Sequence, residues 1–315
     1  MNQTMTKQSW MILLAVSIIW ALSFLLVELA LVEVPPFSIM AARVTIGAAG
    51  LYLMVKVTGG STSGATVAEN NVPSGSVSWR HLWTAFFVLG LLNNVVPFSL
   101  LVWSQTELSA SVASILNATM PLFVVFLAHF FTVDERATLP KVLGVSIGVI
   151  GVALIVGGDG FDLATGGTLG KFAVLGAACS YAVAALVGRH FSRLGLPPLT
   201  LAWGQSTGAA LIALPIVSIF DQPWTLAISM QTWVVLLVLG LLCSSVAYAL
   251  YFRLIAVAGA TNASLVTLTI PPFAILLGVL FLGESLSVHH MLGMVAIFAG
   301  LLVIDGRLQR RRTVT

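Results

Sequence analysis

Two charged side chains lie well inside apolar runs near the start of the chain, Glu28 in the run 10–31 and Arg43 in the run 37–56. A charge at the centre of a bilayer costs about 2.5 to 3.5 kcal/mol on insertion scales, so such a residue usually faces a partner or a water-filled cavity. The turn LVEVPPF between the two runs places both residues at similar depth, where they could form an ion pair. The alternatives are a direct role in binding a solute or a proton, and a position at the membrane interface.

Two prolines interrupt later apolar runs. Pro121 and Pro271 cannot donate the backbone hydrogen bond to the carbonyl four residues earlier, at Asn117 and Thr267. In lipid a freed carbonyl needs another partner, so we expect each kink to face protein or an aqueous cavity. The prolines are therefore predicted as hinges of a central pathway; the alternative is a packing kink that contacts no solute.

The apolar runs also carry amide, hydroxyl and aromatic side chains, which bind a solute or join helices by hydrogen bonds. The adjacent pair Asn93 and Asn94 is unusual in lipid, and Trp20, near the predicted mid-membrane, is the preferred aromatic contact for a solute. The predicted pathway residues are Glu28, Arg43, Trp20, Asn93, Asn94, Asn117, Thr119, Tyr181, Trp203, Gln205, Tyr248, Tyr251, Asn262 and Thr267.

The elements that position these residues are predicted to be membrane helices. The chain has 315 residues, of which 58% are hydrophobic and 8% charged, against roughly 25% charged residues in a soluble domain. Runs of about 20 apolar residues are long enough to cross a bilayer as helices. The sequence predicts an all-α membrane protein with ten spans, at 10–31, 37–56, 82–103, 109–131, 139–157, 171–190, 199–219, 231–252, 260–282 and 288–305.

The chain repeats itself. Residues 83–127 align without a gap with residues 233–277 and share Trp83/Trp233 and Pro121/Pro271. Each copy contains five spans, an odd number, so the second copy is expected to have the inverted orientation in the membrane. In such inverted repeats the solute site lies near the midplane, where the two copies meet. The predicted units are repeat 1–157, which includes a flexible cytoplasmic loop at 57–79, repeat 158–305 and a basic tail at 306–315. Gln205 stands where Arg43 stands in the first copy.

Basic residues mark one side of the predicted membrane. Lysine and arginine concentrate in the loops that share a side with both termini, whereas the other loops carry mainly acids, with Lys171 as their only base. This asymmetry predicts that both termini lie in the cytoplasm. It also accounts for the net charge of +3 without a nucleic-acid partner.

Sequence motifs typical of several enzyme classes are absent. The chain contains no G-x-x-x-x-G-K-[ST] phosphate loop, no H-E-x-x-H metal motif and no G-x-S-x-G nucleophile motif. Its two cysteines, Cys179 and Cys243, have neither the number nor the spacing of a metal site. We therefore expect neither an enzyme nor a bound cofactor or metal.

The order of these features resembles the EamA family of the drug/metabolite transporter superfamily. The resemblance rests on ten spans in an inverted repeat, W-A-x-x-F from Trp20 to Phe24, Arg43 early in the second span, the fourth-span proline, and the acidic residues Glu135 and Glu284 that follow it in each copy. It covers nearly the whole chain. One position departs from the family: the place eight residues after Trp20 often holds lysine, and here it holds Glu28, which would suit an amine or a cation better than an anion.

The resemblance implies a secondary transporter that exports amino acids, related metabolites or drugs by alternating access. A channel-like facilitator or a lipid scramblase is the alternative. The expected partners are a small-molecule substrate and the lipid bilayer, with protons as the candidate coupling ion, and the protein is expected to be a monomer or a homodimer. The expected location is the bacterial inner membrane.

Overall fold

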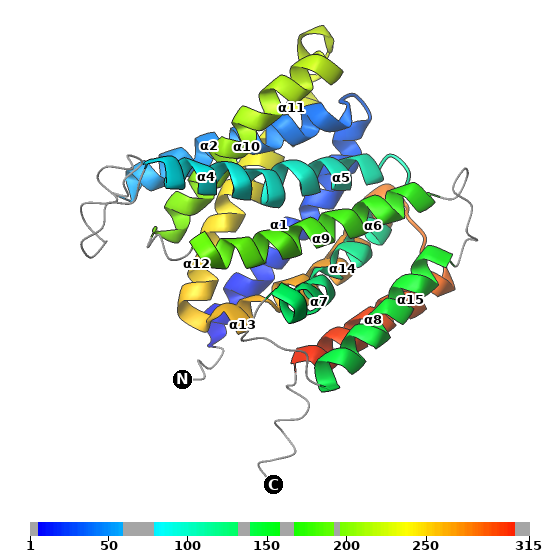
Figure 1. Ribbon diagram of the computed structural model, residues 1–315. Coiled ribbons are helices and arrows are strands. Elements are labelled where there is room, and N and C mark those ends of the chain that lie inside the picture. Colours follow the sequence, from blue (N-terminus) through cyan, green and yellow to red (C-terminus); the bar gives the residue numbers. More distant parts are fainter. Residues whose placement is uncertain (1–5, 59–78, 132–138, 158–166, 192–195, 306–315) are drawn as a thin grey trace, which may run out of the picture.

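The computed structural model describes residues 6–58, 79–131, 139–157, 167–191 and 196–305, and these residues fold into helices and short connections (Figure 1). The predicted loop at 57–79 lies almost wholly outside the described residues, and the predicted tail at 306–315 lies entirely outside them, as does Glu135. The helical elements are α1 (Lys7–Leu31), α2 (Pro36–Val57), α4 (Trp79–Gly90), η1 (Leu91–Val95), α5 (Val96–Ser104), α6 (Ala110–Asn117), α7 (Met120–Phe131), α8 (Leu139–Gly157), α9 (Thr168–Phe191), α10 (Pro198–Phe220), η3 (Pro223–Thr225), α11 (Met230–Gly240), η4 (Leu241–Val246), α12 (Ala247–Ala258), α13 (Ala260–Ala263), α14 (Val266–Leu277), η5 (Gly278–Leu282) and α15 (Val288–Asp305).

Eight helical segments among the described residues are long and apolar enough to cross a membrane. Two further apolar segments, Val266–Leu282 and Val288–Ile304, are shorter. The predicted all-helical membrane class is confirmed, while the ten spans and the inversion of the second half stay predictions. The ends of the predicted spans are mostly within a few residues of the observed ones, and the run predicted at 231–252 extends to Ala258.

The two spans that contain Pro121 and Pro271 are broken rather than smoothly kinked. The first divides into α6 and α7 at Ala118 and Thr119, which places Pro121 in the first turn of α7. The second divides into α13 and α14, and its break lies several residues before Pro271, which is inside α14. Hinge motion at either proline stays a prediction.

Among the described residues there are three π-helical segments that the sequence pattern does not predict: η1 and η4 interrupt α-helices, and η5 ends the segment that begins with α14. In η1 the hydrogen bonds run to the carbonyl five residues back, as from the N–H of Val96 to Leu91. Pro97 has no N–H to continue this pattern to Leu92, and the hydroxyl of Ser180 donates to the Leu92 carbonyl instead, at 2.7 Å. A side chain from α9 thus replaces the missing backbone donor and ties α9 to η1.

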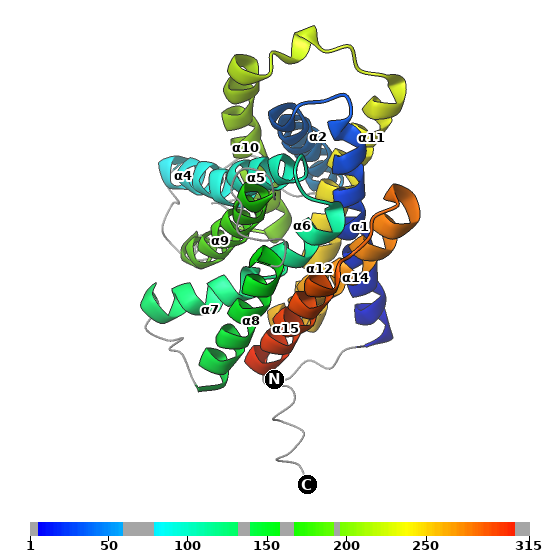
Figure 2. The same ribbon diagram turned by 90° about the vertical axis from the view of Figure 1, so that its right-hand side faces the viewer.

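Helices α8 and α15 lie side by side along one flank of the molecule in both views (Figures 1 and 2). Glycines bring their backbones into contact, because a Cβ at Gly144 would lie 2.6 Å from the carbonyl oxygen of Gly300, and one at Gly151 would lie 2.6 Å from that of Gly293. The register shows that the two helices run antiparallel. Close glycine-mediated packing of this kind is common between membrane helices.

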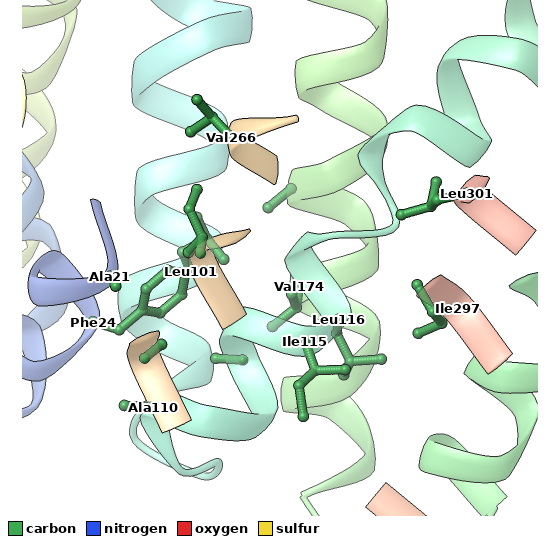
Figure 3. Packing of buried hydrophobic residues seen from close by; sticks show 14 of the residues in the cluster. Ala21, Phe24, Leu101, Ala110, Ile115, Leu116, Val174, Val266, Ile297 and Leu301 are labelled. Atoms are coloured by element: carbon green, nitrogen blue, oxygen red, sulfur yellow. The ribbon is translucent and has the colours of Figure 1, made fainter. Parts of the chain in front are cut away.

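The largest apolar core joins elements from distant parts of the sequence. Figure 3 shows Ala21 and Phe24 of α1, Leu101 of α5, and Ile115 and Leu116 of α6 with side chains of α9, α14 and α15. Ile115 and Leu116 are completely buried. This packing fixes α6, whose last residue, Asn117, faces the site described next.

Candidate functional site

A cavity of about 320 Å³ lies among helices from both halves of the chain. Its walls come from α1, α2, the α4–η1–α5 segment, α6, α7, α9, α10, the η4–α12 segment and α14, whereas α8 and α15 contribute none of its lining residues. The predicted pathway residues that line it are Trp20, Arg43, Asn93, Asn117, Tyr181, Gln205, Tyr248, Tyr251 and Thr267. The cavity therefore collects polar and aromatic groups that are up to 247 positions apart in the chain, from Trp20 to Thr267.

Arg43 is the one charged side chain among the described residues that line the cavity. It is 8% exposed, its guanidinium carbon lies 4.0 Å from the centre of the Phe98 ring, and its Nε donates to the Ser244 hydroxyl at 3.3 Å. The two terminal nitrogens donate to no residue that the structure describes. Stacking on Phe98 fixes the orientation of the guanidinium plane. The two terminal nitrogens then form a bidentate hydrogen-bond donor of the kind that binds carboxylates.

Two amide groups add hydrogen-bonding capacity. The Asn93 amide nitrogen donates to Gln205 Oε1 at 3.4 Å, which connects η1 to α10. Asn117 Oδ1 is buried and accepts no hydrogen bond within the described protein. Because an unsatisfied buried acceptor is costly, Asn117 is suited to receive a donor from a bound solute.

The aromatic wall is formed by Trp20, Tyr248 and Tyr251. The ring centres of Trp20 and Tyr251 lie 5.1 Å apart and those of Trp20 and Tyr248 lie 6.4 Å apart. The Tyr248 hydroxyl is 3.4 Å from Asn94 Oδ1, which orients the ring from outside the cavity. This wall provides flat apolar surface beside the guanidinium.

Glu28 does not line the cavity. Its carboxylate accepts from the Gln105 side chain at 3.3 Å, and the same Gln105 nitrogen donates to the Phe24 carbonyl at 2.9 Å. No ion pair between Glu28 and Arg43 is present in the described part of the chain, since the two residues contact different partners. The ion pair considered for Glu28 is therefore not formed, and its carboxylate instead contacts Gln105, which does line the cavity.

Four other predicted pathway residues also lie outside the lining. Asn94 is buried, and its amide nitrogen donates to no residue in the part of the chain that the structure describes. The Thr119 hydroxyl donates to the Leu116 carbonyl at 2.6 Å, where α6 ends. The Asn262 side chain donates to the Ala258 carbonyl at 2.7 Å. Trp203 packs against Phe86 and Tyr52, away from the cavity. These residues contact helices rather than cavity space.

Several lining residues were not predicted, among them Gln105, Ser23 and Phe98. Gln105 follows an apolar run rather than interrupting it, so its sequence position resembles that of a turn residue. Ser23 donates to the carbonyl of Trp20 at 2.6 Å, as serines in membrane helices commonly do. Phe98 is one of 17 phenylalanines and has no distinguishing neighbour except Pro97. Within the described residues, no group of three potential metal ligands is found.

The sequence matches the model of the EamA-like transporter family twice, over residues 8–157 and 168–305. The chain belongs to the EamA-like transporter family. It is therefore a multi-pass membrane protein of a transporter family, and the resemblance found in the sequence is confirmed. We call residues 8–157 the first half and residues 168–305 the second half.

Several relatives of this family member are named as transporters. One is the "Uncharacterized transporter YoaV" of Bacillus subtilis, 24% identical over 95% of this chain and 97% of the relative. The "Uncharacterized inner membrane transporter YedA" of Escherichia coli is 26% identical over 94% of this chain and 90% of the relative. One solved crystal structure of another protein superposes with a TM-score of 0.66 at 20% identity and covers 98% of this chain and 99% of that one, which supports the fold.

Proposed function

We propose that this protein is a secondary carrier that exports a small solute bearing a carboxylate, such as an amino acid, by alternating access. The observation that carries the proposal is Arg43, a cation with no counter-charge among the described residues of the cavity wall. A buried cation of this kind is stabilised when an anion enters. Its free terminal nitrogens match the two oxygens of a carboxylate.

The rest of the wall favours an amphipathic acid. Asn117 Oδ1 offers an unfilled acceptor for an ammonium or amide donor, and the Trp20 and Tyr251 rings offer surface for an apolar portion. The sequence interpretation of Glu28 favoured an amine or a cation. Because Glu28 contacts Gln105 and does not line the cavity, that argument no longer applies, and the charge that a solute meets is positive.

Alternating access is proposed because the cavity wall is shared by the two halves. Arg43, Asn93 and Asn117 come from the first half, and Tyr181, Gln205 and Tyr251 come from the second. Relative motion of the halves would expose the same groups to either side in turn. Proton coupling remains part of the proposal to be tested with a pH gradient.

The test is efflux from proteoliposomes loaded with labelled amino acids, nucleosides and aromatic amines, with and without an imposed pH gradient. The most informative pair is an aromatic amino acid and the amine that lacks only its carboxylate. Saturable efflux of the acid alone is the expected result, and acceleration by the gradient would identify proton coupling. Equal efflux of acid and amine would contradict the role of Arg43. Efflux that does not saturate would identify a channel-like facilitator, and lipid movement without solute efflux would identify a scramblase.

We further propose that the protein lies in the bacterial inner membrane with both termini in the cytoplasm. The distribution of basic residues supports this topology, and the Escherichia coli relative is named an inner membrane transporter. Fused after Thr315, a reporter that is active only in the cytoplasm is expected to be active, and a reporter that is active only in the periplasm is expected to be inactive. Activity of a periplasm-specific reporter at that position would reverse the topology.

A further inference from the structure

Four carboxylates in the turns between helices bind backbone N–H groups at the starts of other helices. They are Glu33, Glu107, Asp221 and Glu284, and we call them the carboxylate caps. In every case the carboxylate belongs to one half of the chain and the capped helix to the other. The first turn of a helix has unpaired N–H groups and a partial positive charge, so an anion there is stabilising.

The first pair of caps is reciprocal. Glu33, in the turn after α1, accepts from the N–H of Ser229, the N-cap residue just before α11, at 2.8 Å. Asp221, at the end of α10, accepts from the N–H and the hydroxyl of Ser38 in the first turn of α2, at 2.6 and 3.0 Å. The turn between α1 and α2 and the connection between α10 and α11 therefore hold one another.

The second pair of caps, Glu284 and Glu107, makes its hydrogen bonds at or near the turn between α5 and α6. Glu284, which follows η5, accepts from the N–H of Ala110 at 2.7 Å and from the N–H of Ser111 at 3.1 Å, and the Ser111 hydroxyl also donates to it. Glu107, in that same turn, accepts from the N–H of Gly170 in the first turn of α9 at 3.0 Å. One turn of the first half is thus bonded to two separate elements of the second.

The caps lie at one end of the helical assembly. Helices α1, α5 and α10 end there, and α2, α6, α9 and α11 begin there, as these hydrogen bonds require. Figure 2 shows the arching connection from α10 to α11 above the turn from α1 to α2. By the charge asymmetry of the sequence, this is the side opposite to the basic loops.

Each capped helix leads directly to the cavity. Helix α2 carries Arg43, α6 ends at Asn117, α9 carries Tyr181, and α11 continues into η4 with Cys243. Release of a cap therefore frees the end of an element whose other part contacts the cavity. A movement that breaks a cap would therefore also move groups that line the cavity.

We propose that the four carboxylate caps form the gate that closes the cavity at this end, and that they break together when the two halves separate there during transport. Separation of the halves at this end cannot occur without breaking them, since every cap crosses from one half to the other. Glu284 contributes most, because its carboxylate accepts three donors from α6. The inference goes beyond the proposed carrier function by assigning gating residues. It is tested without any solute, so its failure would be separate from failure of the carrier proposal.

The test measures access to the cavity from one side. Ala185 lines the cavity and is half-buried, so Ala185→Cys, made together with Cys179→Ala and Cys243→Ala, places one thiol there. A membrane-impermeant thiol reagent is added either to spheroplasts or to inverted vesicles. Adding Glu284→Gln is expected to raise the labelling rate from the cap side about tenfold, which corresponds to about 1.4 kcal/mol, with no rise from the opposite side.

A second cap and a control keep this test decisive. Glu107→Gln is expected to act in the same direction, and Glu284→Asp to restore part of the slow rate. Ser218→Ala is the matched control, because Ser218 is exposed three residues before Asp221 and its hydroxyl donates to the carbonyl of Leu214 within the same helix, α10. Unchanged labelling in both glutamine variants, with thermal stability retained, would overturn the gate. Faster labelling from both sides alike would also overturn it, since that result indicates general loosening.

Discussion

At the scale of single residues, the site depends on how the buried positive charge of Arg43 is stabilised in an apolar protein. Arg43 is stabilised by the Phe98 ring and by the Ser244 hydroxyl rather than by a carboxylate. An acid of the protein at this place would neutralise the guanidinium and compete with an anionic solute. The observed partners fix the side chain and leave its charge available.

The first prediction concerns this charge. Replacing Arg43 with Gln is expected to raise the KM for a carboxylate solute about ten- to a hundred-fold, because hydrogen bonds to charged groups contribute about 1.5 to 3 kcal/mol. Arg43→Lys is expected to recover only part of the loss, since lysine keeps the charge but not the planar fork. The measurement is concentration-dependent flux in proteoliposomes. Lys56→Gln is the control, because Lys56 lies over Tyr52 and outside the cavity; equal losses in the two variants would refute a specific role.

The second prediction concerns Glu33, which lies in a turn outside the membrane spans. The hydrogen bond from the Ser229 N–H, with smaller contributions from the Thr232 and Ser229 side chains, lowers the pKa of the Glu33 carboxyl below its usual value of 4.5. A lowered folded pKa means that this carboxylate stabilises the fold above pH 4.5 and that its contribution is lost as pH falls through the lower folded pKa. The melting temperatures of the wild type and Glu33→Gln in detergent should therefore differ near neutral pH and converge under strong acid. A constant difference across that range would be inconsistent with the cap.

At the scale of elements, the sequence predicts helices well and their interruptions poorly. Apolar runs are a direct consequence of lipid contact, so nearly every helix is visible in the sequence. The π-helical segment η1 is not visible in the sequence. A change from hydrogen bonds to the carbonyl four residues back to hydrogen bonds to the carbonyl five residues back does not alter the composition. Both Asn93 and Asn94, which lie in this segment, were predicted as pathway residues, and of these two Asn93 lines the cavity.

The third prediction tests the pairing of α8 with α15. Gly151→Ala is expected to destabilise the protein by about 1 to 3 kcal/mol, the usual cost of overpacking, because its Cβ would lie 2.6 Å from the Gly293 carbonyl oxygen. Gly157→Ala on the same helix is the control, since no residue that the structure describes lies within 4 Å of its Cβ. Thermal unfolding in detergent measures both. Because neither helix lines the cavity, the KM of Gly151→Ala should stay unchanged, and a shift in KM would show that α8 contributes to the site.

At the scale of the whole molecule, the chain builds one site from two halves. The duplication could be recognised from the sequence because Trp83 and Pro121 recur at constant spacing as Trp233 and Pro271. The hydrogen bonds between the two halves could not be recognised from the sequence. No local sequence pattern predicts the bond between Glu33 and Ser229 or the bond between Glu284 and Ala110. Contacts between distant turns depend on how the helices are arranged in space, which one sequence does not contain.

The fourth prediction follows from this arrangement. Both halves of one chain supply the cavity wall, so a single chain should transport without help from a second, even if two chains associate. Co-reconstituting wild type with Arg43→Gln at graded ratios and constant total protein should then give a flux that falls in direct proportion to the wild-type fraction. A dimer whose subunits must act together would instead lose flux with roughly the square of that fraction. Distinct tags on the two chains allow the amount of each to be quantified. At equal amounts of wild type and variant, independent chains should keep about half of the flux. A dimer that needs two wild-type subunits should keep about a quarter, if the chains pair at random.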